Sequence, residues 1–410
     1  MEEVADMVNL KLAWEKVRSN GGAGGVDGVT IEAFPRLILG HMEALRGQLL
    51  GGRYEPSPLR RVKIPKPNGG ERLLGIPTVK DRLVQQAILQ VLQPILDPTF
   101  SEHSYGFRPG RNAHQCVDAA QALIQEGRDW VVDVDLEAFF DRVNHDRLMS
   151  RLGHHIADKR VCGTIRGFLR SGVMENGVLS QTTEGTPQGG PLSPLLANLV
   201  LDELDQELER RGLRFVRYAD DCNVYCGSEK AATKAFETLT GFIEGKLRLK
   251  VNREKSAVAR PWERKLLGFS FTRGKNSKRK IAPKALAKAK AKIRDLTKRG
   301  HANFEATMAS LRQYLLGWLG YYRHCQTQSV LTALEEWTRR RLRCLIWRHW
   351  KLGPKRRREL IKRGVPLPLA SQMAGSPQGA WHMSRTPPLS LAFPNRWFAA
   401  KGLPRFLAST

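Results

Sequence analysis

Two adjacent carboxylates, Asp220 and Asp221, occupy the turn between two segments of strand type. Residues 213–216 before them and 223–226 after them are rich in β-branched and aromatic side chains, which is typical of a β-hairpin. Such a turn usually carries glycine, because its backbone must reach positive φ. Neighbouring carboxylates repel each other unless a cation lies beside them, and Mg²⁺ prefers carboxylate oxygens. The pair therefore indicates either a metal site or a solvated acidic turn.

A third carboxylate, Asp135, ends the apolar segment that begins at Trp130. If this segment is a strand, Asp133 and Asp135 lie on the same side of it. A charge at the end of a core strand is costly to bury and is often functional, although an Asp there can equally cap a following helix.

Cations and a flexible loop accompany the acids. Residues 60–77 predict a hairpin with Lys66 and Arg72 near its tip, where they could clamp a triphosphate or simply face solvent. Residues 185–194 predict a Gly/Pro-rich loop that enters an apolar helix over 195–208. Its backbone N–H groups could contact phosphates or bases, with Gln188 as the polar contact.

An aromatic side chain among cations marks residues 104–111. Phe107 next to Arg108 and Arg111 suits base stacking combined with phosphate contact. The alternative is a surface loop with a buried phenylalanine.

Charge and composition narrow the class of partner. The 410 residues carry a formal net charge of +27 and a pI near 10.2, which favours a polyanionic partner because Lys and Arg release counterions from phosphates. No segment is apolar and long enough to span a bilayer, and the acidic N-terminus is unlike a signal peptide. The six cysteines form no metal-binding spacing, so we expect reduced, mostly structural thiols in a cytoplasmic protein.

The remaining segments complete the expected elements. Residues 1–60 look helical, helices are predicted over 81–97 and 231–247, and strands over 249–256 and 266–271. The basic loop 274–280 is the candidate domain boundary.

Beyond that loop the sequence becomes helical and strongly basic. Helices are predicted over 283–298, 304–325 and 330–350, with aromatic side chains among many arginines. These aromatics suit either a nucleic-acid groove or a helical core, and we expect both on different faces. The candidate contacts to nucleic acid are Lys284, Lys288 and Lys292 on one helix face, and Arg356 and Arg357 in the basic run that follows.

Taken in order, these segments resemble the group II intron reverse transcriptase/maturase family, in particular its compact bacterial members. The resemblance covers most of residues 20–272 and continues almost to the C-terminus. The segments that carry it are residues 64–67 with Arg72 and 75–77, 105–110, 135–141, 185–194, 218–221, 267–269, 379–384, 392–398 and 402–403.

The resemblance implies an α+β fold: a right-hand polymerase with fingers and palm, then an α-helical thumb, then a small basic region. The implied domains are 1–272, 273–352 and 353–410. A C-terminal nuclease domain is expected to be absent.

The resemblance also implies roles for single residues. Asp135, Asp220 and Asp221 would hold two Mg²⁺ ions, with the Leu136 carbonyl as a further ligand. The nucleotide would be contacted by Lys66, Arg72, Gln188 and Lys255, and Phe140 would exclude a ribose 2′-hydroxyl.

The expected function is RNA-directed DNA synthesis that copies a group II intron, together with a maturase role in which the protein binds the intron to assist splicing. The expected partners are intron RNA, an RNA template with a DNA primer, target DNA and dNTPs, with no membrane. Two alternatives remain open: a domesticated relative that works in DNA repair or phage defence, and an RNA-binding splicing cofactor without polymerase activity.

Overall fold

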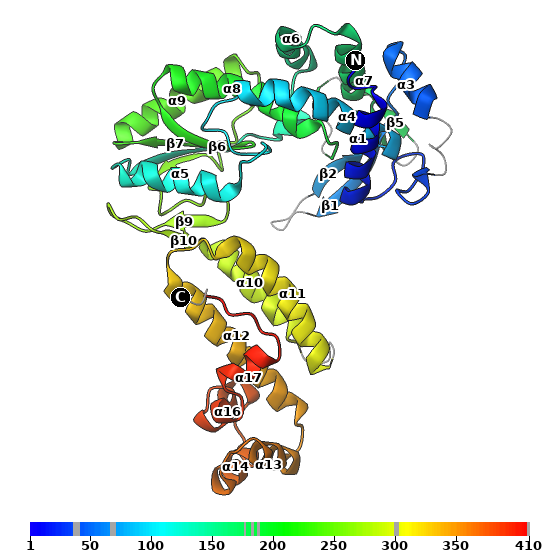
Figure 1. Cartoon of the computed structure of the whole chain (residues 1–410). Coiled ribbons are helices and arrows are strands. Elements are labelled where there is room, and N and C mark those ends of the chain that lie inside the picture. The colour runs from blue at the N-terminus through cyan, green and yellow to red at the C-terminus, as the bar shows by residue number, and fades with distance from the viewer. Residues whose placement is uncertain are drawn as a thin grey trace. The chain divides into compact units, whose positions relative to one another are not determined.

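The structure is a computed structural model, and it describes residues 1–35, 42–65, 71–175, 178–181, 184–186, 189–298 and 303–407 (Figure 1). It divides into two compact units, Met1–Arg260 and Pro261–Thr410. Residues 261–272 lie in the second unit, where their strand pairs. The predicted domain bounds 1–272, 273–352 and 353–410 stay predictions.

The first part of unit 1 combines helices with a four-stranded sheet. Helix α1 (Met7–Asn20) begins after Asp6, whose carboxylate accepts from the backbone N–H groups of Val8 and Asn9, and packs against α4 (Val79–Leu96). The predicted hairpin over 60–77 is confirmed as β1 (Leu59–Pro65) and β2 (Glu71–Ile76). The sheet has the order β2-β1-β4-β5, with β4 (Val173–Glu175) and β5 (Val178–Ser180) completing it.

A second four-stranded sheet forms the centre of unit 1. Its order is β6-β7-β3-β8, and all neighbours are antiparallel: β6 (Arg214–Tyr218), β7 (Asp221–Cys226), β3 (Trp130–Val134) and β8 (Ala257–Ala259). Figure 1 shows α8 (Ser193–Arg210) and α9 (Glu229–Gly245) on one side of this sheet and α5 (Ala113–Gln125) on the other. Helices therefore cover both faces, and β7 is buried from Cys222 to Cys226.

The remaining elements of unit 1 connect these layers. They are α3 (Met42–Leu50), η1 (Asp97–Thr99), η2 (Phe139–Asp141), α6 (His145–His155) and α7 (Lys159–Arg170).

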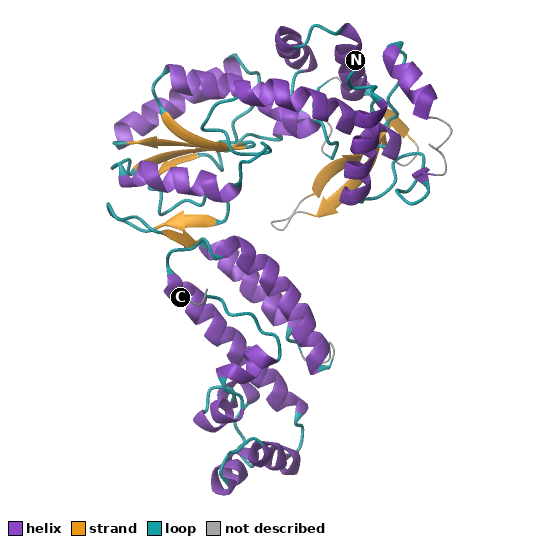
Figure 2. Ribbon diagram, in the orientation of Figure 1, coloured by secondary structure: helices purple, strands orange, loops and turns teal. Residues whose placement is uncertain are grey.

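Unit 2 begins with a small hairpin and continues as helices (Figure 2). Strand β9 (Phe269–Phe271) pairs with β10 (Arg279–Ile281). The three predicted helices are confirmed as α10 (Pro283–Leu296), α11 (Phe304–Tyr322) and α12 (Gln328–His349). Short helices follow: α13 (Gly353–Lys362), α14 (Leu367–Ala374), α15 (Ala380–Met383), α16 (Pro387–Ala392) and α17 (Asn395–Ala400).

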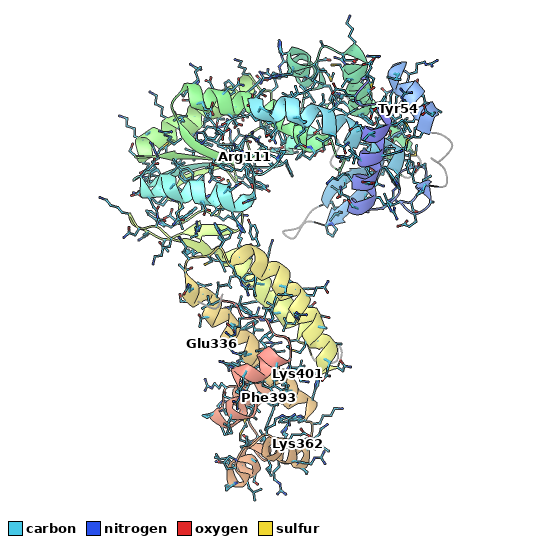
Figure 3. The ribbon with its side chains drawn as sticks, in the orientation of Figure 1. Tyr54, Arg111, Glu336, Lys362, Phe393 and Lys401 are labelled. Atoms are coloured by element: carbon cyan, nitrogen blue, oxygen red, sulfur yellow. The ribbon has the colours of Figure 1, made fainter. Side chains whose placement is uncertain are left out.

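Aromatic rings form the core of the C-terminal region. Phe393, labelled in Figure 3, lies 5.6 Å from Trp350 and 4.7 Å from Trp397 between ring centroids. The guanidinium of Arg363 lies over both Phe393 and Trp350, at 5.0 and 5.2 Å. Trp350, one of the aromatics that the sequence offered for nucleic acid, is therefore a core residue with a cation–π partner.

One predicted strand is wrong. Residues 249–256 form no strand; Val251 makes only an isolated bridge to Leu136, and β8 comes later, at 257–259. Asn252 explains the break, because its carbonyl accepts from the N–H groups of both Lys255 and Ser256 and closes a turn.

Candidate active site

The acidic turn lies where the sequence places it, between β6 and β7. Tyr218 pairs with Asp221, so Ala219 and Asp220 are the two central residues of a tight hairpin. Ala219 has φ = 56°, and it therefore supplies the positive φ that a glycine would normally provide. A non-glycine residue in this conformation needs its surroundings to hold it.

The strand register brings the third carboxylate beside this turn. Strand β3 pairs with β7 so that its last residue, Val134, faces Cys222. Asp135 and Asp221 are the next residues of the two segments, so extending the register by one step would bring them opposite each other. Val132, Val134, Cys222 and Val224 all belong to the core on the α8 and α9 side. Because strand side chains alternate, Asp135 and Asp221 both point to the opposite face, where facing side chains are about 5 Å apart at Cβ.

The backbone after Asp135 also turns an oxygen toward this place. Leu136 forms an antiparallel bridge with Val251, in which Asn252 donates to the Asp135 carbonyl and Glu137 donates to the Lys250 carbonyl, at 2.9 and 2.8 Å. These bonds use the neighbours' groups, so the N–H and C=O of Leu136 point to the other edge, the one on the β7 side.

A cation completes the cluster. The Lys255 Nζ lies 3.7 Å from Asp135 Oδ1, and its side chain is 67% exposed. Lys255 thus lies beside Asp135, and its predicted contact with the nucleotide stays a prediction. Ser256 is uncharged, and its hydroxyl accepts a hydrogen bond from the Asp135 N–H at 3.0 Å, which fixes the end of the strand.

Close backbone contact supports the turn from residues 104–107. Ser104 and Arg217 form a parallel bridge, and a Cβ at Gly106 would lie only 2.2 Å from the Ala219 backbone nitrogen. Only glycine therefore permits this contact. Phe107 follows with φ = 58° and is 47% exposed, with its ring 6.4 Å from that of Tyr218.

The described residues of the Gly/Pro-rich loop contact the η2 region and the β1–β2 hairpin. Thr186 donates to the Phe140 carbonyl at 2.6 Å, and Gly185 donates to the Val143 carbonyl at 2.7 Å. A Cβ at Gly189 would lie 2.9 Å from the Gly75 carbonyl oxygen on β2. The loop thus joins the η2 region to the β1–β2 hairpin.

Phe140 lines two cavities beside this loop. A cavity of about 520 Å³ is lined by Val17, Arg82, Phe107, Phe140 and residues 189–191 among others. A second, of about 300 Å³, is lined by Leu59, Gly75, Phe140 and Thr186 among others. Within the described residues, the buried Thr186 hydroxyl has no hydrogen-bond partner. Such a polar atom facing a cavity is suited to a polar ligand.

The oxygen donors fit a hard divalent cation. In the described part of the chain, no three Asp, Glu, His or Cys side chains are gathered closely enough to hold a metal by themselves. Mg²⁺ does not need such a cage, since it is commonly held by one or two carboxylates, with water and substrate phosphates as the other ligands. Asp135 and Asp221, with the Leu136 carbonyl, match that incomplete oxygen set.

Burial shifts the ionisation of groups beneath the acids. The pKa of the Cys222 thiol is raised, chiefly by burial and then by the charge of Asp205, and that of Cys116 is raised by burial and by the charge of Asp221. Burial and the nearby Asp205 raise the pKa of Asp202 from 3.8 to about 6, although Arg151 opposes this shift.

Two of the predicted contacts to nucleic acid have other partners. The Arg108 side chain is 3% exposed and donates to Asp97 at 2.8 Å, so the prediction that its guanidinium contacts phosphate finds no support. Arg111, labelled in Figure 3, pairs with Glu102 and lies over the Tyr105 ring. Both arginines hold the loop that supports the turn.

The other predicted residues divide by exposure. Lys284, Lys288, Lys292 and Arg357 are exposed. Arg356 instead lies over the Trp347 ring and donates to the Trp350 carbonyl. Lys66, Gln188 and the side chain of Arg72 lie outside the described residues.

Sequence reasoning missed several residues that hold the turn. They are Gly106, Asn198, Asp205 and Arg217, all buried or closely packed. One signal was available: Asn198, Asp202 and Asp205 interrupt an apolar helix at one-turn intervals, which places polar groups on a buried face.

Carboxylates at the ends of adjacent central strands, together with a loop that contacts both the η2 region and the β1–β2 hairpin, indicate a polymerase of the reverse transcriptase class. Comparison with known families agrees: residues 64–271 match "Reverse transcriptase (RNA-dependent DNA polymerase)", and residues 286–364 match "Group II intron, maturase-specific domain". The chain belongs to the group II intron reverse transcriptase/maturase family, as its sequence motifs predicted. The predicted α+β fold is confirmed.

Individual proteins are also similar to this chain. "Protein YkfC" of Escherichia coli is 34% identical over 57% of this chain and 71% of its own length. "Group II intron-encoded protein LtrA" of Lactococcus lactis is 36% identical over 50% of this chain, which spans 34% of LtrA. A chain of a "Partial Cas6-RT-Cas1--Cas2 complex" is 26% identical, with a TM-score of 0.38, over 59% of this chain and 42% of that chain. Across the described residues, no helix is long and apolar enough to cross a membrane.

Proposed function

We propose that this protein is an RNA-directed DNA polymerase that copies a group II intron RNA, and that it also binds the intron as a maturase to assist splicing. The observation that supports the polymerase proposal is the β3–β7 register, whose last pair is Val134 and Cys222, the residues next to Asp135 and Asp221. The maturase-specific match over residues 286–364 supports the splicing role.

In this proposal the carboxylates of Asp135, Asp220 and Asp221, with the Leu136 carbonyl, hold two Mg²⁺ ions. When bound, such ions neutralise phosphate charge and favour ionisation of the attacking 3′-hydroxyl. The chain's own residues then have to bind and orient the nucleotide, because phosphoryl transfer depends mainly on positioning and charge.

Side chains around the acids supply that binding. Lys255 carries a positive charge to the edge of the acidic site, and Lys66, Arg72 and Gln188 contact the nucleotide. Phe140, which lines both cavities, excludes a 2′-hydroxyl. The exposed lysines of α10 and Arg357 bind the phosphates of template, primer, intron RNA or target DNA.

A primer-extension assay tests the polymerase. The full chain should extend a DNA primer on an RNA template with Mg²⁺ and dNTPs, and the Asp220→Ala/Asp221→Ala double variant should not. Asp146→Ala, which removes an 81% exposed carboxylate on α6, is the matched control and should extend normally. Undiminished extension by the double variant would overturn the assignment.

A splicing assay separates the two roles. The same Asp220→Ala/Asp221→Ala variant should still promote splicing of a bound group II intron, because RNA binding needs cations rather than these acids. Loss of splicing with intact RNA binding would show that the roles are not separate. Extension without any effect on intron splicing would favour a domesticated enzyme of repair or defence.

A further inference from the structure

A buried arginine lies directly beneath the acidic turn. Arg217 is 0% exposed and forms a bidentate pair with the Asp205 carboxylate, with Nε–Oδ1 and Nη2–Oδ2 distances of 2.7 and 2.5 Å. Its remaining nitrogen, Nη1, donates to the Asn198 side-chain oxygen at 3.0 Å and to the Ala219 carbonyl at 2.9 Å. One guanidinium thus joins helix α8 to the turn itself.

The same network holds the segment on the other side of the turn. The Asn198 amide donates to the Gly106 carbonyl at 2.8 Å, and Gly106 packs against the Ala219 backbone. The backbone of Arg217 accepts from Tyr105 and donates to His103, at 2.8 and 2.9 Å. Ala219 is therefore fixed by a hydrogen bond to its carbonyl and by contact at its nitrogen.

Stability alone does not explain this arrangement. A buried ion pair usually gains little over apolar residues of similar volume, because desolvation offsets the attraction. Here the pair has a further effect: it fixes a positive-φ alanine one residue before the carboxylates. A fixed guanidinium, with all its neighbours on rigid elements, is suited to hold reacting groups in place.

We infer that Arg217, Asp205 and Asn198 act as a positioning clamp that sets the turn so that Asp220 and Asp221 bind the divalent cation productively. The clamp residues are positioning residues, since they act through Ala219 and touch no substrate. The inference rests on the proposed polymerase function, and it concerns how tightly and how well the acids bind metal.

Two variants separate positioning from stability. Arg217→Met/Asp205→Leu removes the ion pair as a unit and should keep the fold, since both charges leave together. Arg217→Lys keeps the charge but cannot make the bidentate pair and also reach the Ala219 carbonyl. Arg151→Lys is the control, because Arg151 pairs with Asp202 on α8, the helix that also carries Asn198 and Asp205, but does not contact the turn.

The readouts are melting temperature, and primer-extension rate as a function of Mg²⁺ and dNTP concentration. Both clamp variants should show a kcat lower by at least about tenfold and a higher Mg²⁺ midpoint, with little change in the dNTP KM. Raised Mg²⁺ should partly restore the rate, whereas Arg151→Lys should keep the wild-type midpoint.

Specific results would overturn the clamp. The clamp is refuted if the Arg217→Met/Asp205→Leu variant has the wild-type melting temperature together with the wild-type rate and the wild-type Mg²⁺ midpoint. If that variant does not fold, Asn198→Leu, which leaves the ion pair intact, takes its place under the same criterion. Failure of the wild-type chain to extend a primer would instead refute the proposed function, so the two failures are distinguishable.

Discussion

Replacing Gly106 with alanine should disable the polymerase through a single methyl group. The new Cβ would lie 2.2 Å from the Ala219 nitrogen, whereas ordinary contacts begin at 3.4 Å, so the two backbones must separate by about 1.2 Å. The atoms nearest to the new Cβ all belong to the backbone of Tyr218 and Ala219, so they cannot rotate away. Gly106 has no positive φ, and the effect is therefore steric rather than conformational.

The expected magnitude follows from that displacement. A misplacement of about 1 Å at reacting groups costs about a hundredfold in rate, or about 2.7 kcal/mol of transition-state stabilisation. Overpacking should also lower the free energy of unfolding by about 1–3 kcal/mol. We therefore expect a fraction of the Gly106→Ala molecules to stay folded but to extend primers slowly.

Single-turnover primer extension on an RNA template, combined with chemical denaturation, measures both effects. Gly227→Ala is the matched control, because Gly227 follows the other end of β7 and its added Cβ would meet nothing within 4 Å. Gly106→Ala with a wild-type rate, or with a loss no larger than that of Gly227→Ala, would refute the proposed support of the turn.

Two further predictions concern the sugar site and a buried acid. Phe140→Ala should raise ribonucleotide incorporation relative to deoxynucleotide by about tenfold or more, measured as the ratio of kcat/KM values; an unchanged ratio would remove its role in sugar selection. Asp202→Asn should raise stability at pH 8, because the folded state carries an ionised Asp202 there at a net cost of up to about 3 kcal/mol, which already includes the opposing attraction of Arg151. Since the folded pKa of about 6 lies above 3.8, wild-type stability should rise as pH falls through 6 toward 4, and denaturation curves should show the variant losing its advantage over this range. A constant difference between pH 8 and pH 4 would contradict this reasoning.

The pattern of side chains predicted the hairpin elements and the long helices well, because burial imposes a clear periodicity on them. The β6–β7 hairpin and α8 are examples, and both lie within a few residues of the predicted ranges. The segment 249–256 misled because alternation of apolar and polar residues resembles a strand, while a local turn at Asn252 breaks the pairing.

Individual contacts were harder to predict than elements. Arg108 and Arg217 are both arginines near aromatic residues, yet both are buried in ion pairs with carboxylates 11 and 12 residues earlier in the chain. Their partners, Asp97 and Asp205, are set by tertiary packing that no local pattern encodes. The close approach of Gly106 to Ala219 likewise depends on two segments more than 100 residues apart.

The buried thiols around the central sheet offer a reporter of its opening. Cys222 lies on β7, and Cys116 lies on α5, on the other side of the sheet. Both thiols are free and buried, and their raised pKa values leave almost no thiolate at neutral pH. Alkylating reagents can therefore reach them only when the strands separate from their covering helices. The rate of modification at Cys222 and Cys116 thus measures how often the helices on each side separate from the central sheet.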